Sequence, residues 1–120
     1  MKALVADDSP VMRRIVARTL NECGVEEIIQ AGDGVDGWQQ FQANTIDIVF
    51  TDSDMPQKSG VELVQQIRES GSNIPVVVIS PQTNFENVQA TLNDGVTEVL
   101  CRPFAPEALE ETIRKVGSTC

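Results

Sequence analysis

The sequence predicts an α/β protein in which five helices flank a doubly wound, five-stranded parallel sheet. Short runs of β-branched and other apolar residues alternate five times with segments whose apolar residues recur every three or four positions. The connections between them span only a few residues, which favours strands and helices wound around one sheet. With 120 residues we expect one domain over residues 1–120, with an ordered core over about residues 2–116.

The five expected strands are short and largely apolar, as strands buried on both faces of a parallel sheet are. They cover residues 2–6, 26–31, 46–51, 74–80 and 97–101. The second is the least apolar, which suits an edge position. The fourth is the most apolar, which suits the centre of the sheet.

A helix is expected after each strand, and the first has the clearest boundaries. Ser9 is its expected N-cap, Pro10 lies at its first position, where a missing N–H costs nothing, and Gly24 ends it. Its apolar face comprises Met12, Ile15, Val16, Thr19, Leu20 and Cys23. The other helices are expected near residues 35–43, 60–70, 84–93 and 106–116.

The charge of the chain argues against nucleic-acid binding. Its 18 acidic and 9 basic residues give a formal net charge of −9, whereas phosphate contacts need clustered Lys and Arg. The one basic cluster, Arg13 and Arg14 with Arg18, lies along the first helix and is interpreted as a solvated face.

Several other classes of protein are excluded by composition. No apolar run approaches a membrane span and no signal-peptide core precedes Asp7, so we expect a cytoplasmic protein without membrane contact. The three cysteines have no CxxC spacing, which argues against a disulfide framework and a zinc site. Because histidine is absent, Ser-His-Asp catalysis, His metal ligation and a phosphohistidine-carrier role are excluded.

Polar residues of the types found in active sites and metal sites follow or end four of the expected strands. They are Asp7, Asp8, Asp52, Ser80 and Arg102. The carboxyl ends of parallel strands meet at one edge of a sheet, where ligands bind, so these residues are expected to share one crevice. Each alone has a plain structural explanation, such as a turn, an N-cap or a surface ion pair. Their combination at successive strand ends carries the functional interpretation.

The chemistry of this set favours a magnesium-assisted phosphoryl site. Clustered carboxylates repel one another unless a cation neutralises them, and oxygen ligands without His or thiol suit Mg²⁺. Arg102 and the Ser80 hydroxyl would supply a positive charge and a donor to an anion beside the metal. Asp52 is the best-placed nucleophile.

Four motifs together resemble the receiver domain of two-component response regulators, over essentially the whole chain. They are Asp7-Asp8, residues 52–56 followed by Gly60, the strand ending in Ser80, and Arg102-Pro103-Phe104. Residues 9–16 and 33–36 are especially similar to single-domain chemotaxis regulators of the CheY type. The resemblance implies a flavodoxin-like, CheY-like fold with strand order 2-1-3-4-5.

The resemblance also implies roles for individual residues. Asp52 would accept a phosphoryl group from a phosphohistidine on a histidine kinase or phosphotransfer protein. Asp8, Asp52 and the backbone carbonyl of Asp54 would bind Mg²⁺, with Asp7 helping through water. Ser80 would move toward the phosphoryl group, and the face of helix four, strand five and helix five would change its binding of a downstream protein. Such a domain is not an enzyme beyond self-catalysed phosphotransfer and dephosphorylation.

The sequence departs from the usual receiver pattern at four positions. Arg102 stands where Lys is usual, and its planar guanidinium is bulkier. Pro81 follows Ser80 and lacks the N–H expected to hold a phosphoryl oxygen. Val99 replaces the aromatic residue that many members carry, and Asp54 adds a carboxylate that would disfavour the phosphorylated state or position an attacking water.

Two alternatives follow from these departures and from the acidic motif. Pro81 and Arg102 favour a receiver that binds proteins independently of phosphorylation. Asp52 and Asp54, spaced by one residue, also resemble the start of haloacid-dehalogenase-type phosphatases. That reading is weakened because Met55 stands where Thr or Val is usual, and because the acidic pair lies upstream.

Overall fold

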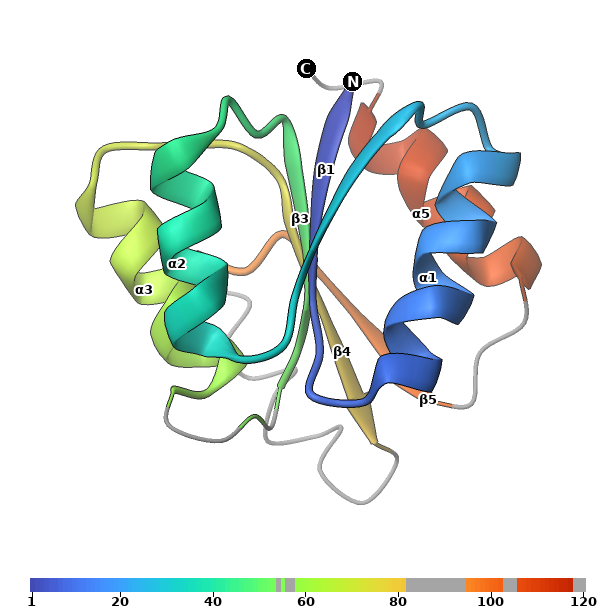
Figure 1. Cartoon of the computed structure of the whole chain (residues 1–120). Helices are drawn as coiled ribbons and strands as arrows, with labels where there is room; N and C mark the ends of the chain where they lie inside the picture. Colours follow the sequence, from blue (N-terminus) through green and yellow to red (C-terminus); the bar gives the residue numbers. More distant parts are fainter. Residues whose placement is uncertain (54, 56–57, 82–94, 103–105, 118–120) are drawn as a thin grey trace.

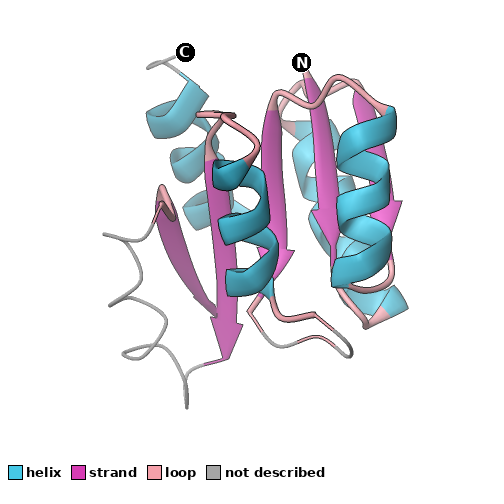
Figure 2. Cartoon of the chain, turned by 90° about the vertical axis from the view of Figure 1, so that its left-hand side faces the viewer, coloured by secondary structure: helices cyan, strands magenta, loops and turns pink. Residues whose placement is uncertain are grey.

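A five-stranded parallel sheet forms the centre of the molecule, in the order β2-β1-β3-β4-β5. The computed structural model describes residues 1–53, 55, 58–81, 95–102 and 106–117. The strands are β1 (Lys2–Ala6), β2 (Glu27–Ala31), β3 (Ile48–Asp52), β4 (Val76–Pro81) and β5 (Glu98–Arg102). All arrows point the same way in Figure 2. The predicted fold class and strand order are confirmed.

Helices cover both faces of the sheet. They are α1 (Pro10–Glu22), α2 (Gly34–Ala43), α3 (Gly60–Glu69) and α5 (Pro106–Gly117). Figure 1 shows α2 and α3 on one side of the sheet and α1 and α5 on the other. The helix expected near residues 84–93 lies outside the described residues.

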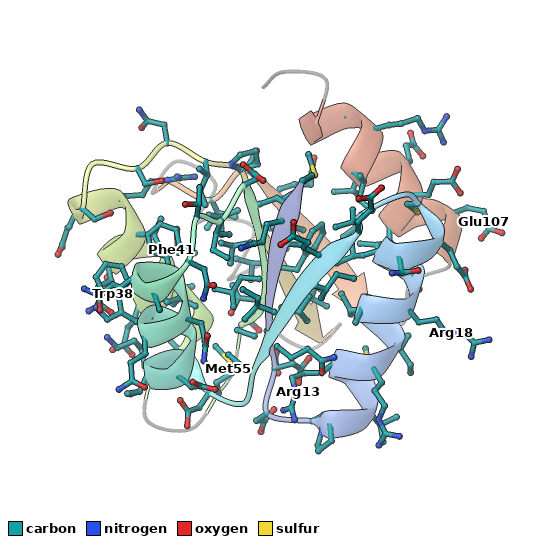
Figure 3. All side chains as sticks on the ribbon, turned by 45° about the horizontal axis from the view of Figure 1, so that its top comes forward. Arg13, Arg18, Trp38, Phe41, Met55 and Glu107 are labelled. Atoms are coloured by element: carbon teal, nitrogen blue, oxygen red, sulfur yellow. The ribbon has the colours of Figure 1, made fainter. Side chains whose placement is uncertain are left out.

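The alternation of side chains along each strand divides the core into two layers. On one face Leu4, Val49 and Val78 pack with Leu63 and Ile67 of α3, and the neighbouring rings of Trp38 and Phe41 cover this layer. Figure 3 shows these two rings on the α2 side. On the other face the fully buried side chains of Val5 and Phe50 pack with those of Val16, Leu20 and Leu109 from α1 and α5.

Side-chain caps fix where α1, α2 and α3 begin. Ser9 accepts a hydrogen bond from the Met12 amide (3.2 Å), as its expected capping role requires. Asp33 accepts from the Asp36 amide (2.7 Å) at α2. Ser59 forms a reciprocal capping box with Glu62 at α3. The β1–α1 and β3–α3 connections therefore have defined exits at the carboxyl edge of the sheet.

Several sequence expectations need correction. β2 spans Glu27–Ala31 and β5 spans Glu98–Arg102, where strands over 26–31 and 97–101 were expected. β3 begins at Ile48 and includes Asp52, where a strand over 46–51 was expected. β4 begins at Val76, since Pro75 has no N–H to pair, and it continues beyond Ser80 to Pro81. Ile15 is 49% exposed, because it shares the outer side of α1 with Val11 instead of facing the sheet.

In the described part of the chain, every helix is too short or too polar to cross a bilayer.

Candidate functional site

The first part of the site is the turn that leaves β1. Asp7 is 2% exposed, and its amide donates to the Ala31 carbonyl of β2 (3.0 Å). Its carboxylate accepts a hydrogen bond from the Ser9 amide (2.9 Å). Asp8 follows with an exposed side chain. The chain thus holds one carboxylate firmly at the strand end and leaves the next open to solvent.

The second part is the end of β3, where Asp52 is 3% exposed. The amide of the next residue, Ser53, donates to the Ile79 carbonyl of β4 (3.0 Å), and the Ser53 carbonyl accepts from the Gly60 amide (3.1 Å). A Cβ atom on Gly60 would lie 2.1 Å from the Asp52 carbonyl oxygen. Only glycine lets α3 start this close to the strand that carries Asp52.

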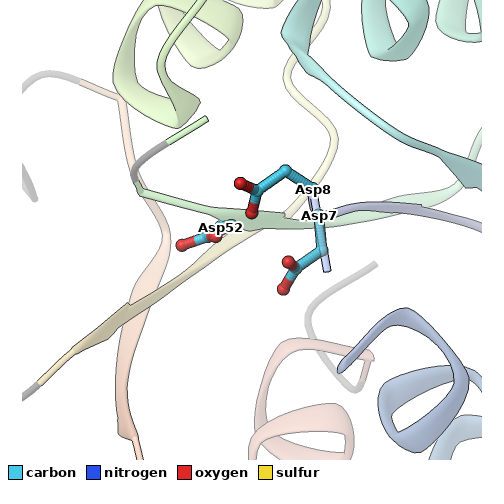
Figure 4. Close-up of side chains that lie close together, drawn as sticks. All are labelled: Asp7, Asp8 and Asp52. Carbon is cyan, nitrogen blue, oxygen red and sulfur yellow. The ribbon is translucent and has the colours of Figure 1, made fainter. Parts of the chain in front are cut away.

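Three carboxylates meet where these two strands end. Oxygen atoms of Asp7, Asp8 and Asp52 all lie within 4.8 Å of one another. Figure 4 shows the three side chains close together. Mg²⁺ binds oxygen ligands at about 2.0–2.1 Å and usually keeps several waters, so carboxylates this close together can share one ion directly or through its waters. The donor set is all oxygen, which Mg²⁺ prefers. These three residues therefore fit the expected metal.

The remaining predicted site residues lie along the neighbouring strands. Asp52 is in register with Ile79, so Ser80 is one residue further along β4, and its side chain is completely buried. The backbone of Arg102 is in register with Pro81 at the same edge. The side chains of Pro81 and Arg102, and all of Asp54, lie outside the described residues. The structure thus brings Asp7, Asp8, Asp52 and the Ser80 position to one edge.

The sequence interpretation missed a contact made by Arg13. We expected this residue on a solvated helix face, but its side chain is half-buried and its guanidinium Nη1 donates to the Asp7 carbonyl (2.6 Å). Figure 3 shows Arg13 at the start of α1 and Arg18 further along the helix. Arg18, whose side chain is 84% exposed, fits the predicted solvated face. The spacing of six residues from Asp7 follows no common capping pattern, so it gave no signal.

Comparison with protein families matches residues 3–114 to the model of the response regulator receiver domain. The chain belongs to this family. The receiver domain resembles Chemotaxis protein CheY1 of Helicobacter pylori at 35% identity, covering 99% of this chain and 98% of that protein. It also resembles the Chemotaxis protein CheY homolog of Campylobacter jejuni at 33% identity, covering 99% and 94%.

Solved structures agree with this assignment. Chemotaxis response regulator CheY4 of Vibrio cholerae superposes with a TM-score of 0.86 at 32% identity, covering 96% of this chain and 97% of that one. A receiver domain protein from Clostridium thermocellum superposes with a TM-score of 0.90 at 25% identity, covering 98% and 94%.

The receiver family is a signalling family and not a classical enzyme family, which favours the receiver interpretation over a haloacid-dehalogenase-type phosphatase. The arrangement of the acids agrees. Asp7 and Asp8 come from the end of β1 and Asp52 from the end of the adjacent β3, so the acidic pair upstream in sequence belongs to the same cluster.

Proposed function

We propose that this receiver domain accepts a phosphoryl group on Asp52 in a Mg²⁺-dependent reaction and acts in two-component signal transduction. The phosphoryl donor would be a phosphohistidine on a histidine kinase or phosphotransfer protein. The observation that carries the proposal is the Asp52 carboxylate, nearly buried at the carboxyl edge of the sheet, with oxygens of Asp7 and Asp8 within 4.8 Å. Residues 1–120 would act as one domain.

The chemistry would use residues of this chain in distinct roles. An oxygen of Asp52 forms the new P–O bond as the P–N bond to the donor imidazole breaks. Asp8, Asp52 and the Asp54 carbonyl would bind Mg²⁺, with Asp7 acting through water. When bound, the ion offsets the negative charge that gathers on the phosphoryl oxygens. Ser80 and Arg102 would donate to those oxygens.

The response to phosphorylation would involve the face of helix four, β5 and α5. The described part of this face includes a shallow hollow of about 250 Å³ between β5 and α5, lined by Glu98, Leu100, Ala108, Glu111, Thr112 and Lys115. Val99 is 7% exposed and packs in the core beside Val78. This chain therefore has no aromatic side chain at this position that could change its orientation on phosphorylation. We propose that the protein is cytoplasmic and binds a downstream protein target on this face, and that it acts in chemotaxis, as the names of its relatives suggest.

The first test is intact mass after incubation with acetyl phosphate and Mg²⁺. We expect one phosphoryl adduct on the wild type and none on Asp52→Asn. Omitting Mg²⁺ or adding EDTA should suppress the adduct. An adduct of equal yield on the Asn variant would disprove Asp52 as the acceptor.

A second function is favoured by Pro81. It is the last residue of β4, in register with Arg102, and without an N–H it offers no backbone donor to a phosphoryl oxygen. If neither acetyl phosphate gives an adduct nor beryllofluoride perturbs the amide NMR spectrum, the domain acts as a phosphorylation-independent binding module.

A further inference from the structure

The side chain of Arg13 joins α1 to the turn that carries the acidic pair. The contacts of Asp7 include three hydrogen bonds: its amide donates to the Ala31 carbonyl (3.0 Å), its carboxylate accepts from the Ser9 amide (2.9 Å), and its carbonyl accepts from Arg13 (2.6 Å). The carbonyl contact is the only one of the three made by a charged group. It fixes the orientation of the peptide between Asp7 and Asp8, from which the exposed Asp8 side chain projects.

The guanidinium of Arg13 also lies near Gly32, at the start of the β2–α2 connection. A Cβ atom on Gly32 would lie 3.6 Å from Nη1 of Arg13, an ordinary van der Waals distance, so the contact with Asp7 does not depend on glycine at this position. Gly32 itself donates to the Asp36 carboxylate (3.3 Å) at the N-terminus of α2. Arg13 therefore bonds to the β1–α1 connection and lies near the β2–α2 connection at the carboxyl edge.

We propose that Arg13 is a positioning residue that holds the Asp7–Asp8 turn in the conformation needed to bind a divalent cation. The proposal rests on the proposed function, because it assigns a purpose to the turn within that site. Arg13 acts through the Asp7 carbonyl and does not contact the metal. A guanidinium with a planar set of donors keeps a fixed direction toward one carbonyl better than a flexible ammonium does.

The sign of the effect on metal affinity separates positioning from simple charge. Arg13 carries a positive charge near the cation site, so its removal should tighten Mg²⁺ binding if only Coulomb repulsion matters. If the hydrogen bond orders the turn, removing it should weaken Mg²⁺ binding, because the entropy cost of ordering the turn is then met when the ion binds.

The test is a Mg²⁺ titration followed by amide NMR shifts, which does not require phosphorylation. We expect Arg13→Gln to weaken binding about tenfold, as loss of a charge-assisted hydrogen bond predicts. Arg14→Gln is the matched control: it removes the same charge from an exposed neighbour and should leave affinity unchanged or slightly tighter. Arg13→Lys keeps the charge and should restore part of the loss.

Two results would overturn the proposal. One is Mg²⁺ binding by Arg13→Gln that is as tight as by Arg14→Gln, with the wild type binding normally, which would leave the proposed function intact. The other is a wild type that does not bind Mg²⁺, which would remove the metal from the proposed function as well. Melting curves in EDTA confirm that each variant is folded. If Arg13→Gln does not fold, the Mg²⁺ affinity of Arg13→Lys is compared with that of the wild type, and equal affinity overturns the proposal.

Discussion

Gly60 lies where α3 begins, against the backbone of the strand that carries the proposed phosphoryl acceptor. Its amide donates to the Ser53 carbonyl (3.1 Å), and a Cβ atom would lie 2.1 Å from the Asp52 carbonyl oxygen. Backbone cannot rotate away as the end of a long side chain can. Any larger residue must therefore move either the helix or the strand end, and with it the Asp52 carboxylate.

We predict that Gly60→Ala lowers the free energy of unfolding by about 2–4 kcal/mol and strongly reduces phosphorylation of Asp52. Gly24→Ala is the control, because Gly24 has a φ of 95° but open space around its Cα. That variant should lose about 1 kcal/mol and phosphorylate normally. Urea denaturation and the acetyl phosphate adduct provide the two measurements. Normal phosphorylation of Gly60→Ala would show that the strand end tolerates the shift.

For single residues, the sequence predicts where the acidic side chains lie better than it predicts the contacts that hold them there. Asp7, Asp8 and Asp52 could be placed together because each follows or ends an apolar strand, and parallel strands end at one edge. The contact between Arg13 and the Asp7 carbonyl could not be predicted, since it depends on the path of a long side chain. The close approach of Gly60 to Asp52 likewise depends on how near α3 packs to β3.

Among the elements, α3 is anchored at the edge of the sheet opposite the site by Arg68. The guanidinium donates to the carbonyls of Gly95 (2.9 Å), Ser72 (3.1 Å) and Ile74 (2.7 Å). Burial lowers the pKa of Arg68 from its usual value, so these hydrogen bonds compensate for lost solvation of the charge. One side chain thereby connects the end of α3 with the segments that enter β4 and β5.

We predict that Arg68→Met destabilises the protein by about 2–4 kcal/mol, because three carbonyls lose their charged donor. The acetyl phosphate adduct on Asp52 should form normally under folding conditions, since Arg68 lies far along the strands from the site. Arg18→Met is the control: it breaks an exposed pair with Glu22 (3.6 Å) and should change stability by less than about 0.5 kcal/mol. Equal destabilisation of the two variants would refute the anchoring role.

The elements themselves were largely readable from the sequence, since hydrophobic periodicity and caps such as Ser9 mark them directly. The exact ends of these elements, and which helix faces are buried, were harder to predict. Ile15 fits the helical repeat of the α1 core face, yet it is exposed together with Val11. Periodicity gives the stripe on a helix but does not set its width, which depends on where α5 and the sheet make contact.

Across the whole molecule, folding concentrates negative charge that the unfolded chain keeps apart. Asp7 and Asp8 are separated from Asp52 by more than forty positions in the sequence, but their oxygens lie within 4.8 Å in the fold. The net charge of −9 adds to this repulsion. We therefore expect repulsion among these carboxylates to lower the stability of the native state, and a bound divalent cation to relieve that repulsion.

We expect two opposite effects when one carboxylate of the cluster is neutralised. In EDTA, Asp8→Asn should be more stable than the wild type by about 0.5–1.5 kcal/mol, because repulsion is relieved. As Mg²⁺ is added at constant ionic strength, the wild type should gain about 1.4 kcal/mol at ten times its dissociation constant. The variant should gain much less, so the two stability curves cross. Glu26→Gln, a change at an exposed residue just before β2 and on the opposite edge, controls for general screening and should follow the wild type. Parallel curves for wild type and Asp8→Asn in urea denaturation would mean that Mg²⁺ acts on the overall charge and not on this cluster.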